Sequence, residues 1–123
     1  MYKSDQNNKN LGNFGENIAK RYLLQRGYTI IDQNQKRSYQ EIDIIAKIGK
    51  INVFVEVKTR RLGGWQSATE ALGPKKIKNL KKFRRQVICG GDFAGEKVRF
   101  DFIDIDFNEQ NKTAKISHFK EIF

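Results

Sequence analysis

Three residues of the types that hold a metal ion and assist hydrolysis occur close together in this chain: Asp43, Glu56 and Lys58. If the two carboxylates lie side by side, at roughly 5 Å and an effective dielectric of about 20, they repel each other by about 3 kcal/mol. A protonated carboxyl group, a neighbouring lysine or a divalent cation would offset this repulsion. Mg²⁺ commonly takes one or two carboxylates from a protein and completes its shell with water and phosphate. Lys58 could then hold the attacking water or balance charge on a phosphate.

A β-hairpin would position these residues. Residues 41–48 and 51–58 have strand-like compositions, and Gly49-Lys50 between them fits a type II′ turn. Side chains alternate between the two faces of a strand. The register set by the turn therefore places two charged pairs on one face, Asp43–Glu56 and Glu41–Lys58. The other face is expected to be apolar and to consist of Ile42, Ile44, Val53, Val55 and Val57.

The same hairpin has a second interpretation. The charged face could be an ordinary solvated sheet surface on which Glu41 and Lys58 form an ion pair. The E-x-K triplet alone does not separate the two interpretations, because charged strands often contain it. The acid at position 43, one cross-strand step from Glu56, makes the pattern more specific.

The remaining elements follow from hydrophobic periodicity and from glycine and proline. They predict one mixed α/β sheet flanked by two helices, in the order α-β-β-β-α-β-β. Residues 1–11 are expected to form a flexible arm and residues 12–123 a single domain. The expected elements are a helix from about 14 to Gly27, strands at 28–31 and in the hairpin, a polar link over 34–39, a helix from Pro74 to Gly90-Gly91, and strands at 98–107 and 113–119, with a bulge near Phe102-Ile103.

Net charge indicates the class of partner. The chain carries 24 Lys and Arg against 14 Asp and Glu, for a formal charge of +10. Such a chain attracts polyanions, nucleic acid first and an anionic membrane surface second, although a merely basic protein is also possible. No apolar run approaches the roughly 18 residues that span a bilayer. The start lacks the apolar region of a signal peptide, and the single cysteine fits a reducing compartment, so we expect a cytoplasmic protein without a membrane segment.

Cationic side chains gather on the second predicted helix, and no acid lies among them. Like charges at this spacing destabilise a helix, and phosphate groups would relieve the repulsion. The alternative is a solvated basic face. Lys76 is expected to reach the site. The predicted nucleic-acid contacts are Arg60, Arg61, Lys75, Lys76, Lys78 and Lys82.

Other residues leave alternatives open. Glu16 follows Asn13 at the spacing of a helix capping box, and it could also face the site. Trp65 could stack on an unpaired base or fill a core or interface position. Arg99 and Asp101 are expected to be structural, Cys89 to lie in the core, and His118 has no visible partner.

Several segments together resemble the YraN-type family of small bacterial proteins, which is related to archaeal Holliday junction resolvases and belongs to the PD-(D/E)-x-K nuclease superfamily. The matching segments are GNFGENIAKRYLLQRGYTII, QEIDIIA, FVEVKTR, KIKNL and RFDFIDI. This chain departs from the family at Gln40, where glycine is usual. Ile42 replaces the proline of the nominal P-D motif, as is normal for this branch.

The resemblance implies a restriction-endonuclease-like fold and a set of catalytic residues. Asp43 and Glu56 would be metal ligands with the Val57 carbonyl, Lys58 would be the motif lysine, and Glu16 would be an outer ligand. The implied activity is an endonuclease that hydrolyses phosphodiesters in DNA with Mg²⁺ or Mn²⁺. Branched DNA and a homodimer are suggested by analogy with resolvases. The rival functions are a non-catalytic nucleic-acid-binding module and a charged protein-interaction domain.

Overall fold

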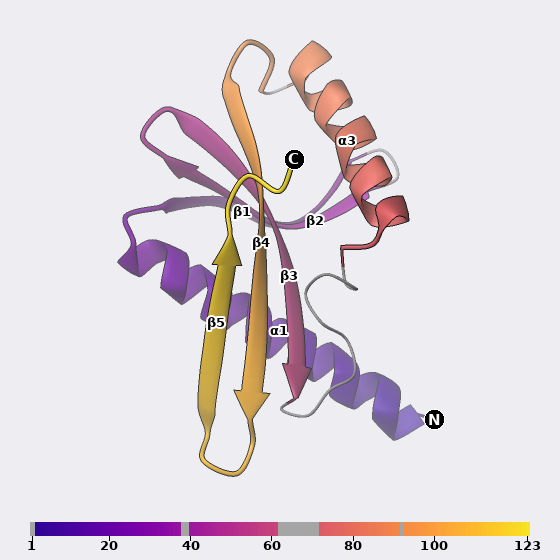
Figure 1. Cartoon of the computed structure of the whole chain (residues 1–123), viewed down its shortest axis with the longest axis vertical. Coiled ribbons are helices and arrows are strands. Elements are labelled where there is room, and N and C mark those ends of the chain that lie inside the picture. The colour runs from indigo at the N-terminus through magenta and orange to yellow at the C-terminus, as the bar shows by residue number, and fades with distance from the viewer. Residues whose placement is uncertain (1, 38–39, 62–71, 92) are drawn as a thin grey trace.

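A five-stranded sheet with one helix on each face forms the centre of the protein (Figure 1). The computed structural model describes residues 2–37, 40–61, 72–91 and 93–123, without the side chains of residues 2–10, 34–37 and 40–41. The strand order is β1-β2-β3-β4-β5, and only β3 and β4 run parallel. The predicted order of elements is confirmed. The elements are α1 (Tyr2–Gln25), β1 (Thr29–Arg37), β2 (Gln40–Ile48), β3 (Ile51–Arg61), α3 (Pro74–Cys89), β4 (Lys97–Asn108) and β5 (Thr113–Phe119).

Helix α1 ends where the sequence predicted and begins earlier. Gly27 has a φ of 89°, and the Tyr28 N–H donates to the Leu23 carbonyl, which together close the helix in a Schellman-type turn. The helix starts at Tyr2 and not after residue 11, because extending an existing helix through polar residues costs little. The flexibility of residues 1–11 stays a prediction.

Strand β1 is longer than predicted. It continues to Arg37, and Gln35 and Lys36 pair with Ile42 and Glu41 of β2. The expected polar link over 34–39 is therefore wrong up to residue 37, since main-chain pairing with a neighbouring strand forms a strand without an apolar side-chain pattern.

Both faces of the sheet are buried. The cluster under α1 contains Ala19, Leu23, Tyr28, Ile44, Ala46, Val53, Val55, Ile103 and Ile105. The cluster under α3 contains Ile42, Ile45, Phe54, Leu80, Phe83, Val87, Phe93 and Phe100. Strand β4 contributes to both clusters, which explains its mixed apolar pattern. Its pairing with β3 and with β5 is continuous, so the predicted bulge at Phe102-Ile103 is wrong.

Helix α3 forms the crossover that two parallel strands require. Pro74 begins it, as predicted, and its buried residues are Leu80, Phe83 and Val87. Cys89, expected in the core, is exposed because it lies at the end of the helix beyond this buried face. Among the described residues, we find no helix with the length and apolar content that crossing a membrane requires.

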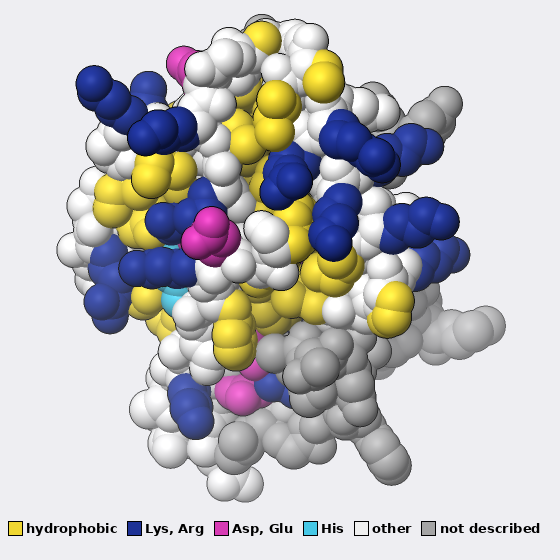
Figure 2. Space-filling view, turned by 45° about the horizontal axis from the view of Figure 1, so that its top comes forward, with side chains coloured by type: hydrophobic (Ala, Val, Ile, Leu, Met, Phe, Trp, Pro, Cys, Tyr) yellow, Lys and Arg dark blue, Asp and Glu magenta, His cyan; other side chains and the backbone are white. Residues whose placement is uncertain are grey.

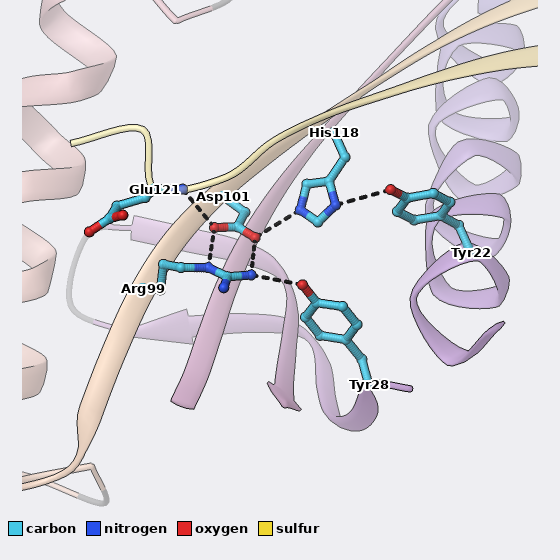
Figure 3. Close-up of polar contacts among 6 residues, drawn as sticks. All are labelled: Tyr22, Tyr28, Arg99, Asp101, His118 and Glu121. Carbon is cyan, nitrogen blue, oxygen red and sulfur yellow. Dashed lines mark hydrogen bonds and ion pairs between the residues drawn. The ribbon is translucent and has the colours of Figure 1, made fainter. Parts of the chain in front are cut away.

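A network of charged and polar side chains connects α1 to strands β4 and β5 (Figure 3). Arg99 forms two hydrogen bonds with Asp101, of 2.9 and 2.8 Å, and also donates to the Tyr28 hydroxyl. His118 Nε2 lies 2.8 Å from Asp101, and its Nδ1 lies 3.2 Å from the Tyr22 hydroxyl. The prediction that Arg99 and Asp101 are structural fits this network. His118, which the sequence left without a partner, has two.

Candidate metal and nucleic-acid site

The register of the β2–β3 hairpin is confirmed from the turn as far as the pair Ile44–Val55. Gly49 has a φ of 58°, while Lys50 is not among the residues of positive φ. This combination fits a type II′ turn and excludes type I′, which needs positive φ at both positions. The predicted register is therefore confirmed for the five pairs next to the turn, and the predicted pair Asp43–Glu56 lies just beyond the last of them.

Beyond that pair, the side chain of Asp43 takes the place of a main-chain acceptor. The Val57 N–H donates to Asp43 Oδ2 at 2.8 Å. In a regular ladder the same N–H would donate to the carbonyl of Ile42. Ile42 instead packs in the cluster under α3, while Ile44 packs under α1. The prediction that Ile42 and Ile44 share one face is therefore wrong, because the ladder is irregular at Asp43.

This irregularity places the carboxylate of Asp43 at the main chain of β3. The N–H that Asp43 binds belongs to the peptide bond joining Glu56 to Val57. The carboxylate of Asp43 thus lies at the main chain between the second predicted acid and the residue whose carbonyl was predicted as a third oxygen ligand.

Glu56 lies beneath α3 and forms an ion pair with that helix. Lys76 Nζ is 3.0 Å from Glu56 Oε1, and the two side chains are 32% and 19% exposed. The expectation that Lys76 reaches the site is confirmed. Half-buried pairs of this kind are held more firmly than surface pairs, because water screens them less.

Lys58 is exposed, and its neighbour differs from the predicted one. It pairs in register with Asp104 of the parallel strand β4. Glu41, the predicted partner of Lys58, pairs along the main chain with Lys36 of β1, and its side chain lies outside the described residues. The regular β2–β3 pairing ends at Ile44, so the Glu41–Lys58 pair is not part of it.

Two acids of β4 continue the site and were not predicted. Arg60 Nη2 donates to Asp104 Oδ2 at 2.6 Å, and Arg60 Nε lies 3.4 Å from Asp106 Oδ1. Asp104 Oδ1 is buried without a hydrogen-bond partner. The signal in the sequence was the alternation of Asp104 and Asp106 with apolar residues, but only the β3–β4 register places these acids beside Lys58 and Arg60.

Glu16 follows a point of very close contact between α1 and β3. A Cβ atom added to Gly15 would lie only 1.6 Å from Thr59 Oγ1. Glu16 is half-buried, and it lies next to the glycine that contacts the strand of Glu56 and Lys58. The helix therefore brings Glu16 toward the site strand, whichever of its two predicted roles it has.

The other predicted nucleic-acid contacts are distributed over α3 and the end of β3. Lys75, Lys78 and Lys82 are exposed on α3. Arg61 forms a surface ion pair with Glu109, at 2.6 Å. Trp65 and the glycines at 63 and 64 lie outside the described residues.

The donors at this site suit a hard divalent cation. Two carboxylates and a carbonyl supply only oxygen, which Mg²⁺ and Mn²⁺ prefer, and Glu56 already attracts a cation in the form of Lys76. Within the described ranges there is no group of three or more His, Cys, Asp or Glu residues that could hold a metal. Any metal held by Asp43, Glu56 and the Val57 carbonyl would have to take its remaining ligands from water or phosphate.

Comparison with known proteins gives the family. A UPF0102 protein of Alkaliphilus oremlandii is 36% identical over 118 residues, which cover 94% of this chain and 99% of the relative. A UPF0102 protein of Clostridium tetani is 38% identical over 116 residues, which cover 94% of this chain and 95% of the relative. The model of the uncharacterised protein family UPF0102 matches residues 15–105. This is the YraN-type family that the sequence resembled. The chain therefore belongs to the UPF0102 family.

Proposed function

We propose that this protein is a divalent-metal-dependent endonuclease that hydrolyses phosphodiester bonds in DNA. The observation that carries the proposal is the hydrogen bond from the Val57 N–H to Asp43 Oδ2. This bond fixes one carboxylate at the main chain beside the second carboxylate, Glu56. A pair of acids held in this way next to a lysine is the arrangement expected for phosphodiester hydrolysis with a metal.

Each residue has a distinct task in the proposed site. Asp43, Glu56 and the Val57 carbonyl would hold the cation. A bound Mg²⁺ or Mn²⁺ supplies Lewis acidity and a more acidic water. Lys58 is exposed and free to approach a phosphate, where it orients the attacking water or balances charge. Glu16 acts from the side of α1.

Helix α3 and the end of β3 would hold the phosphate backbone. Lys75, Lys78 and Lys82 are exposed and can contact phosphates, which position DNA without reading its sequence. Lys76 is engaged with Glu56 and therefore links the DNA-binding helix to the metal site. Arg60 is held by Asp104 and Asp106, so we assign it to positioning within the sheet. Arg61 would have to leave Glu109 to meet a phosphate.

The irregular strand favours a catalytic site over the non-catalytic rival. A module that only bound nucleic acid would need the cations of α3, but it would have no need to interrupt the β2–β3 ladder for an acid. The second rival, a protein-interaction domain, predicts that nucleic acid will not compete for its charged surface. The restriction-endonuclease-like fold, a homodimer and a cytoplasmic location remain proposals that rest on the family resemblance.

The test uses binding and cleavage of linear, flapped and four-way DNA, with and without Mn²⁺, for the wild type and for Asp43→Asn. Asparagine can still accept the hydrogen bond from the Val57 N–H, so we expect the variant to fold, to bind DNA and to lose cleavage. Preference among the three DNA forms would show whether branched DNA is the substrate.

Three results would contradict the proposal. Cleavage that survives Asp43→Asn would remove the proposed site. Salt-sensitive DNA binding without metal-dependent cleavage by the wild type would assign the protein to the non-catalytic rival. A protein that binds none of the three DNA forms at low salt would leave the protein-interaction rival.

A further inference from the structure

A groove of about 760 Å³ runs along α3, on the side away from its buried face. Its apolar part consists of Leu72, Pro74 and Ile77. Pro74 is exposed and Leu72 and Ile77 are half-buried, so the groove offers apolar surface to a ligand. Figure 2 shows hydrophobic side chains exposed in a band between groups of Lys and Arg side chains.

Four cations line the same groove: Lys78, Lys81, Arg84 and Arg85. No acid is among the described residues that line it. Arg84 Nε is buried and has no hydrogen-bond partner. A ligand for this groove must therefore carry several negative charges and accept hydrogen bonds.

An aromatic ring lies beside these cations. The Arg84 guanidinium is 5.3 Å from the centroid of the Phe123 ring, and Lys81 Nζ is 5.9 Å from it. Cations placed over an aromatic ring are held in position without being neutralised by an acid. The positive charge of the groove thus remains available to an anion.

We infer that this groove binds an unpaired strand of nucleic acid. The inference rests on the proposed function and specifies its substrate class as DNA with a single-stranded segment. Phosphates would meet the four cations, and exposed bases would bury the apolar floor of the groove. In a duplex the base faces are stacked on one another and only base edges are exposed in the grooves, so no base face would cover Leu72, Pro74 and Ile77.

Consecutive residues of α3 contact the groove and the proposed metal site. Ile77 lines the groove, and Lys76 before it reaches Glu56. Lys76 is directed to Glu56 beneath α3, whereas the groove lies on the side of α3 away from its buried face. A strand held in the groove would therefore have to pass around the helix to bring the cleaved bond to the two carboxylates.

The test measures binding of an oligothymidylate and of a duplex of equal length by fluorescence anisotropy, in EDTA, so that cleavage plays no part. We expect Arg84→Ala/Arg85→Ala to weaken single-strand binding about tenfold and to lower the salt slope by about 1.4, which corresponds to two phosphate contacts of about 0.7 each. Ile77→Ser should weaken single-strand binding several-fold and leave duplex binding nearly unchanged. Circular dichroism of each variant checks that it is folded.

The control is Arg21→Ala/Lys50→Ala, which removes the same charge from exposed residues of α1 and of the β2–β3 turn. Equal losses in the control and in the groove variant, or equal effects of Ile77→Ser on both DNA forms, would overturn the inference. The inference would also be overturned if an acidic, leucine-rich peptide bound the groove while the groove variants kept their single-strand binding. Failure of the proposed function can be distinguished from failure of this inference, because the binding measurements do not depend on cleavage.

Discussion

Lys76 Nζ lies 3.0 Å from Glu56 Oε1, so a cation from the strongly basic helix α3 is held against a predicted metal ligand. The contact connects the two functional parts of the proposed enzyme. It also means that a metal ion at Glu56 must share that carboxylate with an ammonium group or displace it.

Lys76→Ala should therefore strengthen metal binding. A partly exposed ion pair contributes on the order of 1 kcal/mol, so removal of the competing ammonium should raise the affinity for Mn²⁺ by roughly threefold to tenfold. Isothermal titration calorimetry measures the effect. Lys75→Ala is the matched control, because its exposed side chain carries the same charge one residue earlier. Weaker Mn²⁺ binding by Lys76→Ala would contradict the assignment of Glu56 as a ligand.

The close contact between α1 and β3 gives a second prediction. Gly15→Ala would place a methyl group 1.6 Å from Thr59 Oγ1 and 2.8 Å from Thr59 Cβ. The helix must then move, and we expect a loss of about 2 kcal/mol in the free energy of unfolding. The double variant Gly15→Ala/Thr59→Ala should regain only part of this free energy, because the contact with Thr59 Cβ remains. Chemical denaturation measures the free energy of unfolding of the wild type, of Gly15→Ala and of the double variant.

Gly12→Ala is the control for this prediction. The added Cβ would meet nothing within 4 Å, and alanine is a better helix former than glycine. This variant should be as stable as the wild type or more stable by up to about 1 kcal/mol. Equal destabilisation at both glycines would show that helix propensity, and not the contact with Thr59, determines the effect.

Local chemistry explains what the sequence predicted well. Gly49-Lys50 specifies a turn type, the turn specifies a register, and this register was correct as far as Ile44–Val55. Helix α3 followed from the spacing of Leu80, Phe83 and Val87. In each case the signal came from residues adjacent in the sequence or one helical turn apart.

Contacts made across long stretches of chain could not be predicted in the same way. Asp104 lies beside Lys58 only because the crossover through α3 sets the β3–β4 register. His118 meets Asp101 because β4 and β5 pair. The displacement of Ile42 to the α3 side depends on Asp43 taking a main-chain hydrogen bond, which strict alternation of side chains does not anticipate.

The Arg60–Asp104 pair gives a third prediction. Asp104 is 5% exposed, and its removal would leave the guanidinium of Arg60 without its closest acceptor. We expect Asp104→Ala to lower the free energy of unfolding by about 3 kcal/mol, as is usual when one partner of a buried ion pair is lost. Asp106→Ala removes a longer contact of 3.4 Å from a more exposed side chain, and it should cost less than about 1 kcal/mol. Similar losses for the two variants would contradict a special role for Asp104.

The last prediction concerns acid stability and the network around Asp101. Burial raises the pKa of this carboxyl group, but hydrogen bonds from His118, Arg99 and the Glu121 N–H outweigh burial and lower the pKa below its ordinary value of 3.8. Unfolding therefore takes up a proton at acid pH. The stabilisation by Asp101 is fully present above pH 3.8 and is lost as the pH falls from there through the pKa of the folded state.

Asp101→Asn tests this sign directly. The variant should lose about 3 kcal/mol of stability at neutral pH, because Arg99 keeps its charge without the buried carboxylate. Below pH 3.8 the difference from the wild type should shrink, since the wild type loses the same interaction by protonation. Glu121→Gln is the control, because its side chain is exposed and only its main-chain N–H contacts Asp101. Urea unfolding across this pH range measures the difference, and a gap that stays constant or widens in acid would contradict a lowered pKa of Asp101.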